Sequence, residues 1–267
     1  MPKNRISVSR PSWRIPERLA TPEGVFLNRR TALGLGLAAG ASVAMPRPAA
    51  ALFGFGSSKV YGPPEDDPST ALYPVPRNDA FKLDRDVTPA EYNYNFNNYY
   101  EFGSSKSIAA SAQALPIRPW EISIEGLVEK PFKIGIDDLL KAMPLEERLY
   151  RHRCVEAWSM AIPWSGFPLR ALVEHAKPLG SAKYLEMITF ENPKVASGQS
   201  ATWYPWPYRE GLTIAEATND LAFIATGAYG KPLPKQMGSP LRLAVPWKYG
   251  FKSVKAIIVF KFTEERP

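Results

Sequence analysis

The single cysteine of this 267-residue chain, Cys154, has polar and strongly cationic neighbours. Arg151, His152 and Arg153 precede it, and Glu156 follows two residues later. Nearby guanidinium and imidazole groups favour the thiolate over the thiol, and the thiolate is the form of cysteine that attacks electrophiles or binds metals. Cys154 is therefore the first candidate for a reactive or metal-binding residue.

Three interpretations of Cys154 stay open on the residues alone. The first is a small packed side chain at the end of a strand. The second is a nucleophile with His152 or His175 as its base, although no third group to orient the base is evident. The third is a thiolate ligand to a soft or redox-active metal that is held mainly by a cofactor. A structural zinc site is excluded, since the chain has two histidines and one cysteine.

Three ordered motifs give the chain a resemblance to a known family. The motifs are residues 96–102 (FNNYYEF), residues 153–160 (RCVEAWSM) with the following Pro163-Trp164 and Gly166-Phe167-Pro168-Leu169, and residues 245–252 (VPWKYGFK). Together they resemble motifs of the periplasmic, molybdopterin-dependent protein-methionine-sulfoxide reductase catalytic subunits. The similarity extends from Phe96 to Pro267.

The resemblance implies an α+β protein of the sulfite-oxidase fold, with mixed sheets, barrel-like strands and short helices, that binds one Mo-molybdopterin. In that family the pterin dithiolene and a single protein cysteine ligate molybdenum, and Cys154 matches this cysteine. Cys154 and Glu156 are accordingly the predicted catalytic residues, with Cys154 also the metal ligand. The positions that match contacts to the pterin and its phosphate are Asn97, Tyr100, Glu101, Thr189, Arg242, Ser253, Val254 and Lys255.

The residue types at several of these positions suit such a cofactor. Arg242 and Lys255 can offset the charge of a phosphate, and Asn97 and Thr189 can hydrogen-bond the polar edge of a pterin.

Two features depart from the family's pattern. Met237 occupies a position where the family usually offers an asparagine to the cofactor, and a thioether is a poor hydrogen-bond partner. The chain also ends at Pro267, where relatives continue with a further C-terminal segment.

The resemblance also implies a reaction and its partners. The enzyme would reduce methionine sulfoxide in oxidised periplasmic proteins to methionine, as protein repair, with electrons from a membrane-bound, haem-containing partner. The rival interpretations are a sulfite-oxidase-like activity on a small anion and a non-catalytic module that kept the fold. Glu156 would repel a sulfite dianion if it faces the metal, whereas Trp158 and Trp164 offer apolar surface that suits a methionine side chain or core packing.

The elements that position these residues follow from hydrophobic periodicity, which predicts more strands than helices. The predicted strands cover residues 120–125, 149–155, 184–190, 241–245 and 254–263. The predicted helices cover residues 136–143 and 169–176, the second ended by Pro178, and residues 213–216 fit a helix capping box.

The first 51 residues carry most of the chain's positive charge. The net charge is +7, but residues 1–51 hold eight Lys/Arg against two Asp/Glu, so the remainder is nearly neutral and a nucleic-acid partner is not expected. Arg29-Arg30 before the mildly apolar residues 31–45 match a twin-arginine signal peptide, with cleavage expected after Ala51. This apolar run is too short to span a bilayer.

The sequence therefore predicts a protein that is exported to the periplasm in the folded state. Residues 52–115, rich in proline and asparagine, are expected to form an ordered, irregular N-terminal arm that contacts the cofactor. Residues 116–267 are expected to form the molybdopterin-binding oxidoreductase domain.

Overall fold

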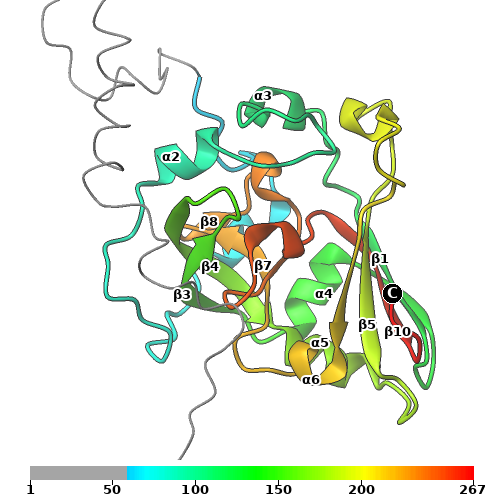
Figure 1. Cartoon of the computed structure of the whole chain (residues 1–267). Helices are drawn as coiled ribbons and strands as arrows, with labels where there is room; N and C mark the ends of the chain where they lie inside the picture. The colour runs from blue at the N-terminus through cyan, green and yellow to red at the C-terminus, as the bar shows by residue number, and fades with distance from the viewer. Residues whose placement is uncertain (1–58) are drawn as a thin grey trace, which may run out of the picture. The chain divides into compact units, whose positions relative to one another are not determined.

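The computed structural model describes residues 59–267, which form one compact unit. The predicted signal peptide, residues 1–51, lies outside the described residues. The fold is mixed α+β, with two sheets and few helices, as predicted. In the view of Figure 1, the sheet that contains β1, β5 and β10 lies to the right, and the sheet that contains β3, β4, β7 and β8 lies to the left.

The first sheet has five strands in the order β2-β1-β10-β5-β6, and β1 and β10 are its parallel pair. Ile122 and Ile124 of β1 point into the core, which is why this segment shows the alternation typical of a half-buried strand. The bounds are β1 (Glu121–Gly126), β2 (Phe132–Gly135), β5 (Tyr184–Thr189), β6 (Arg209–Thr213) and β10 (Ile257–Thr263).

The second sheet carries the cysteine region. Its order is β3-β4-β7-β8, with β9 also pairing β7. β3 and β4 form an antiparallel hairpin that runs from the pair Glu146 and Gly166 to the pair Arg153 and Ser159. The bounds are β3 (Glu146–Arg153), β4 (Ser159–Pro168), β7 (Phe223–Ala228), β8 (Lys231–Pro232) and β9 (Arg242–Ala244).

Short helices complete the core. The two predicted helices are confirmed as α4 (Ile136–Ala142) and α5 (Leu169–Ala176), but α5 ends before Pro178, because Lys177 adopts a left-handed conformation (φ 50°). The predicted capping box is confirmed at α6 (Ile214–Ala217), where Thr213 accepts a hydrogen bond from the Glu216 amide. Single-turn 3-10 helices are η4 (Ser197–Ser200), η5 (Lys235–Met237) and η6 (Gly250–Lys252).

Residues 59–115 contain short helices as well as irregular chain. These helices are η3 (Pro68–Leu72), α2 (Ala90–Asn95) and α3 (Ala109–Ala112). The expectation of an ordered, irregular arm is therefore corrected at η3, α2 and α3. Tyr99, Phe102 and Leu115 are buried in the same hydrophobic cluster as the strands of the first sheet. The end of this segment, residues 99–115, thus contributes to the core.

The structure corrects one further expectation and contains strands that were not predicted. The last strand begins at Ile257 and not at residue 254, because Ala256 has a positive φ of 46° that interrupts extended chain. β4 and β7 were not predicted: β4 contains Pro163 and Gly166, which read as strand breakers, and β7 is buried along its whole length and so shows no alternation. No helix in the described part of the chain has the length and hydropathy needed to traverse a bilayer.

Candidate active site

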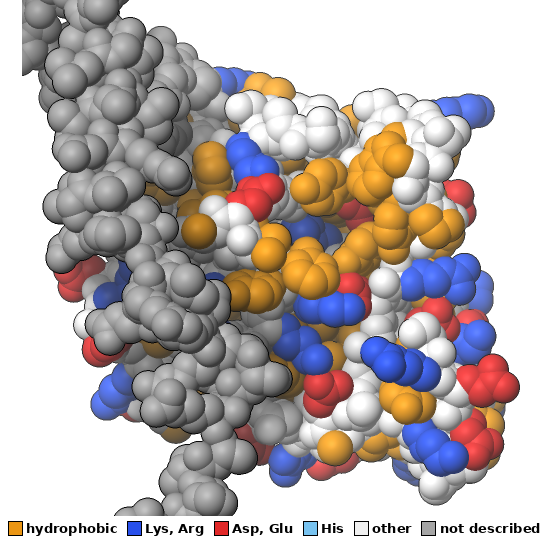
Figure 2. All heavy atoms as spheres, in the orientation of Figure 1, with side chains coloured by type: hydrophobic (Ala, Val, Ile, Leu, Met, Phe, Trp, Pro, Cys, Tyr) orange, Lys and Arg blue, Asp and Glu red, His pale blue; other side chains and the backbone are white. Residues whose placement is uncertain are grey.

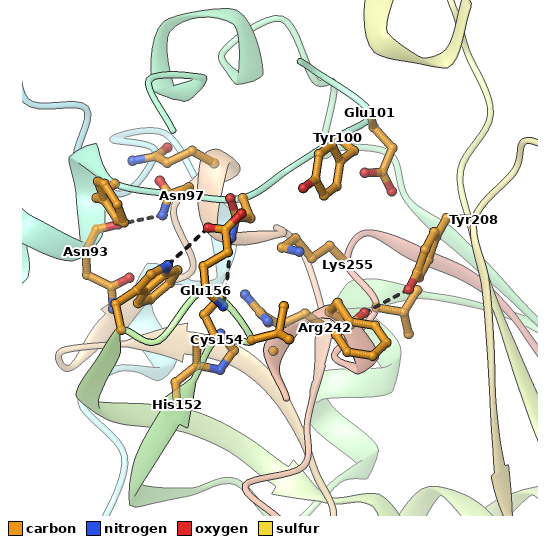
Figure 3. Close-up of a pocket in the computed structure, with 18 of the residues that line it drawn as sticks. Asn93, Asn97, Tyr100, Glu101, His152, Cys154, Glu156, Tyr208, Arg242 and Lys255 are labelled. Carbon is orange, nitrogen blue, oxygen red and sulfur yellow. Dashed lines mark hydrogen bonds between the residues drawn. The ribbon is translucent and has the colours of Figure 1, made fainter. Parts of the chain in front are cut away.

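One pocket of about 390 Å³ collects most of the predicted site residues from distant parts of the chain. Its wall is formed by residues 93–101 at and after the end of α2, by the β3–β4 turn, by β9 and by the segment around η6. Figure 3 shows these side chains converging from several elements. Of the ten predicted residues, the eight on its lining are Asn97, Tyr100, Glu101, Cys154, Glu156, Arg242, Val254 and Lys255.

Cys154 lies directly after β3, in the turn that joins β3 to β4. The turn is closed by a hydrogen bond from the Cys154 amide to the Trp158 carbonyl (2.9 Å), and Ala157 adopts a positive φ of 65° within it. The sulfur accepts hydrogen bonds from Asn98 Nδ2 (3.4 Å) and from the Glu156 amide (3.5 Å). Although Cys154 is buried, its side chain lines the pocket, so the interpretation as an inert packed residue is disfavoured.

Glu156 lies in the same turn but at the solvent-exposed side of the pocket. Its carboxylate forms an ion pair with Lys106 (2.8 Å) and accepts a longer hydrogen bond from Trp158 Nε1 (3.4 Å). The hydrogen bond from Lys106 is the main reason why the pKa of Glu156 lies below its usual value. Glu156 therefore presents an ionised carboxylate beside Cys154.

Arg242 and Lys255 form the cationic inner wall of the pocket. An isolated antiparallel bridge pairs their backbones, which places both side chains on the same face. Arg242 is buried, and its guanidinium donates to the carbonyls of Met237 (2.9 Å) and Ser253 (3.3 Å). Burial lowers the pKa of Arg242 to about 10, and burial next to Arg242 lowers the pKa of Lys255 to about 7.

His152 lines the pocket from β3, two residues before Cys154. Its environment holds the pKa of the imidazole well below its usual value, because of burial and then the nearby charges of Arg242 and Lys255. The ring is therefore neutral. A side chain at Gly250 would place Cβ only 2.6 Å from His152 Nε2, so this position in η6 needs glycine.

Asn97 and Glu101 are buried polar residues on the lining. Asn97 Nδ2 donates to the Asn93 carbonyl (2.7 Å), but Asn97 Oδ1 has no hydrogen-bond partner within residues 59–267. Burial raises the pKa of Glu101, and the charge of Lys255 opposes that shift. An acceptor left without a donor at a buried position favours a ligand with N–H groups at this point.

Two predicted residues lie behind the lining. Thr189 is buried, and its hydroxyl donates to the Lys255 carbonyl (2.8 Å). Ser253 is also buried, and its carbonyl accepts the bond from Arg242. Both therefore position the two cations in this structure and do not themselves face the pocket.

Several lining residues were not predicted as site residues. His152 was considered as a base for Cys154 but not as part of a cofactor site. An aromatic wall lies opposite the cysteine turn, in the loop between η4 and β6, and the sequence shows it as a dense run, WYPWPY. The aromatic wall consists of Trp203, Tyr204, Trp206 and Tyr208.

The residues present fit a molybdopterin. Within residues 59–267, neither Arg242 nor Lys255 forms a salt bridge, so the pocket offers buried positive charge that a phosphate can neutralise. The His, Cys, Asp and Glu side chains of this region form no group of three or more that could hold a metal ion. A metal here would need most of its ligands from the cofactor, with Cys154 as the protein's contribution.

Met237 does not face the pocket. Its side chain is buried in the cluster that contains Trp164 and Leu233, and only its carbonyl contributes, by accepting the bond from Arg242. The neighbouring Gln236 lines the pocket instead. Methionine at position 237 thus lacks the polar side chain that asparagine has in the family, but its backbone carbonyl still accepts the hydrogen bond from Arg242.

Comparison with known proteins agrees with this geometry. The family described as "Oxidoreductase molybdopterin binding domain" matches residues 110–267. The crystal structure of the sulfane dehydrogenase SoxCD from Paracoccus pantotrophus is similar with a TM-score of 0.53 at 20% identity, over 68% of this chain and 45% of that one. That likeness supports the fold, which is the predicted sulfite-oxidase type.

Curated relatives give a closer match. The protein-methionine-sulfoxide reductase catalytic subunit of Xanthomonas campestris pv. campestris is 41% identical over 260 residues, which cover 97% of this chain and 77% of the relative. The corresponding subunit of Pseudomonas syringae pv. tomato is 43% identical over 255 residues, covering 92% and 74%. The chain therefore belongs to the molybdopterin-dependent family of protein-methionine-sulfoxide reductase catalytic subunits.

Proposed function

We propose that this protein is a periplasmic molybdoenzyme that reduces methionine sulfoxide residues of oxidised proteins to methionine. The observation that carries the proposal is the meeting of one cysteine sulfur with two buried cations, Arg242 and Lys255, in a single pocket. This pairing suits a cofactor that has a metal at one end and a phosphate at the other.

The residues divide the binding of the cofactor between them. Cys154 would ligate molybdenum, because a thiolate is a soft ligand and a metal-bound thiol is deprotonated. Arg242 and Lys255 would neutralise the phosphate, while Asn97 Oδ1 would accept a hydrogen bond from the pterin. When bound, the cofactor supplies the two electrons that convert a sulfoxide and two protons into a thioether and water.

The chain's own side chains define where the sulfoxide lies. The cysteine turn places the Glu156 carboxylate beside Cys154, and Lys106 holds that carboxylate in place. The neutral His152 ring adds no charge next to the sulfur. A neutral sulfoxide is compatible with this arrangement. Because Lys106 is already paired with Glu156, this ion pair offers little net attraction for a sulfite dianion.

The test compares two reactions on one preparation whose molybdenum content is known. We expect reduction of methionine sulfoxide with a reduced viologen as donor, with a kcat/KM at least about tenfold above that for sulfite oxidation with an artificial acceptor. A larger kcat/KM for sulfite would favour the rival enzyme class. A molybdenum-loaded protein that catalyses neither reaction would favour the non-catalytic module.

The electron donor is proposed to be a membrane-bound haem protein. The support is the resemblance to the family of protein-methionine-sulfoxide reductase catalytic subunits. Reduced haem in membranes should reoxidise on addition of the loaded protein and an oxidised protein substrate. No reoxidation above that with unoxidised substrate would contradict this donor.

A further inference from the structure

Exposed hydrophobic side chains gather at the mouth of the pocket. Four large ones line both the pocket and the protein surface, and we call them the mouth rim: Tyr100, Val155, Trp203 and Phe251. Val155 and Trp203 are the most exposed of the four, at 61% and 64%. Figure 2 shows hydrophobic side chains in a band on this face of the protein. Such a concentration of apolar surface is typical of a binding site.

The rim is fixed in place by ring contacts. The Trp203 ring packs edge-on against Tyr100 at 5.8 Å between centroids and against Trp206 at 6.1 Å. Tyr208 stacks on Tyr204, and its single hydroxyl proton is shared between the Glu210 carboxylate (2.7 Å) and the Phe251 carbonyl (2.9 Å). The loop that carries Trp203 is thus tied to the turn that carries Phe251, and the two sides of the mouth are preorganised.

Two carboxylates near the rim are paired with lysines. Glu156 is neutralised by Lys106, and Lys252, next to Phe251, forms an ion pair with the buried Glu210 (2.7 Å). Within residues 59–267, these two carboxylates are thus each paired with a lysine, and the mouth rim itself consists of aromatic and aliphatic side chains. This surface favours an uncharged polypeptide backbone and aliphatic side-chain carbons over a strongly acidic or basic partner.

The length of a methionine side chain places its backbone at this rim. Methionine is unbranched and has three rotatable side-chain bonds. Val155 of the rim directly follows Cys154 in the chain, so a methionine sulfoxide that approaches Cys154 has its own backbone near the rim. Neighbouring residues of the substrate, spaced by about 3.8 Å between Cα atoms, must then run across the rim. A free amino acid has no such neighbours to make these contacts.

We propose that the mouth rim binds the polypeptide on either side of a methionine sulfoxide and thereby selects protein-bound sulfoxide over the free amino acid. This inference rests on the proposed function. It assigns Trp203 and Phe251 as specificity-determining residues that act on the substrate backbone and not on the sulfoxide group itself.

The test uses two substrates with a viologen donor: free methionine sulfoxide, and the same sulfoxide in the centre of a short unstructured peptide of alanine, serine and glutamine. We expect Trp203→Ala and Phe251→Ala each to lower the ratio of kcat/KM for peptide over free sulfoxide by about tenfold. Leu179→Ala, which removes an exposed side chain that does not line the pocket, should leave the ratio unchanged. Rates are expressed per bound molybdenum, and folding is checked by circular dichroism.

A binding measurement separates the rim from catalysis. A fluorescent peptide of the same sequence, with methionine sulfone at its centre, should bind the loaded wild-type protein about tenfold more tightly than it binds Trp203→Ala. If the wild type reduces neither substrate but still binds the peptide more tightly than Trp203→Ala does, the proposed function fails and the proposal of peptide binding at the rim stands. An unchanged ratio together with an unchanged Kd overturns the rim proposal. The proposal is also overturned if the rim variants lose turnover with the membrane haem donor but not with viologen, because the rim would then bind that donor.

Discussion

The side-chain amide of Asn98 donates a hydrogen bond to the sulfur of Cys154 at 3.4 Å, from a segment 56 residues away in the chain. The contact joins residues 59–115 to the cysteine turn. It also places a polarised N–H group on the atom proposed to ligate molybdenum. Hydrogen bonds to ligand sulfurs stabilise the more electron-rich state of a metal centre, so Asn98 should raise the reduction potential.

Asn98→Ala should therefore lower the molybdenum midpoint potential. The expected change is about 40 mV, which is equivalent to a hydrogen bond worth about 1 kcal/mol in a one-electron couple. The potential is measured by redox titration monitored by electron paramagnetic resonance. Asn95→Ala is the matched control, because Asn95 donates to the Glu91 carbonyl and not to the sulfur. A potential equal to that of the wild type would show that the hydrogen bond does not tune the centre.

Lys255 makes the stability of the cofactor-free protein depend on pH. In the unfolded chain its ammonium keeps its proton up to a pH of about 10, whereas in the folded protein its pKa is about 7. Between these values the unfolded state binds more protons, so the free energy of unfolding should rise with pH over this window, by on the order of a few kcal/mol.

Lys255→Met should remove this rise and stabilise the cofactor-free protein below pH 7, because it removes a buried charge. The same change should weaken retention of molybdopterin, since the phosphate loses a cation. Urea unfolding at several pH values and molybdenum analysis measure the two effects. Lys130→Met, at an exposed position, serves as the control. A Lys255→Met variant with the wild-type pH dependence would refute the shifted pKa.

The ion pair between Lys106 and Glu156 should hold the cysteine turn more than it stabilises the fold. Because the pair is partly exposed, Lys106→Met should cost less than about 1 kcal/mol of unfolding free energy. Hydrogen exchange of the Cys154 amide, which bonds to Trp158, should become faster. The pKa of Glu156 should rise, and any limb of the pH–rate profile that reports its ionisation should move to higher pH.

Lys141→Met provides the comparison, since it breaks a more exposed lysine–carboxylate pair, with Asp138, that is distant in sequence from the turn. Equal exchange rates for the Cys154 amide in the wild type and the Lys106 variant would show that the turn is held by other contacts.

The proposed export route depends on arginine identity. Replacing Arg29-Arg30 with two lysines keeps the charge but should strand loaded protein in the cytoplasm, because the twin-arginine pathway recognises the arginine pair. Cell fractionation with molybdenum analysis measures the outcome. Normal periplasmic amounts of the lysine variant would argue for a different export route.

The features that the sequence predicted best are those determined by the local pattern of residues. The strand of Ile122 and Ile124 and the capping box at Thr213 follow from alternation and from local hydrogen bonding. β7 could not be predicted in this way, since its six residues are buried on both faces. The β3–β4 hairpin escaped prediction because Pro163 and Gly166 lie inside β4, where pairing on both sides compensates for the breakers.

Site residues that lie in a sequence motif could be predicted, whereas site residues that only tertiary contacts bring together could not. Cys154 stood out by the charged residues next to it in the sequence, but Asn98 comes within hydrogen-bond distance of it only in the folded protein. Thr189 was predicted to contact the cofactor, whereas in the structure its hydroxyl bonds the Lys255 carbonyl, a contact across 66 residues. The neutral state of His152 likewise depends first on its burial and then on the charges of Arg242 and Lys255, all of which only the fold produces.

Replacement of Cys154 by serine tests the central claim most directly. A serine hydroxyl is a hard, weakly acidic ligand compared with a thiolate, so Cys154→Ser should lose the bond between the protein and molybdenum while the fold survives. X-ray absorption at the molybdenum edge should show one sulfur neighbour fewer than in the wild type. Turnover of methionine sulfoxide per bound molybdenum should fall by at least about 100-fold. A folded Cys154→Ser protein with the wild-type sulfur environment and wild-type turnover would contradict the assignment of Cys154 as the metal ligand.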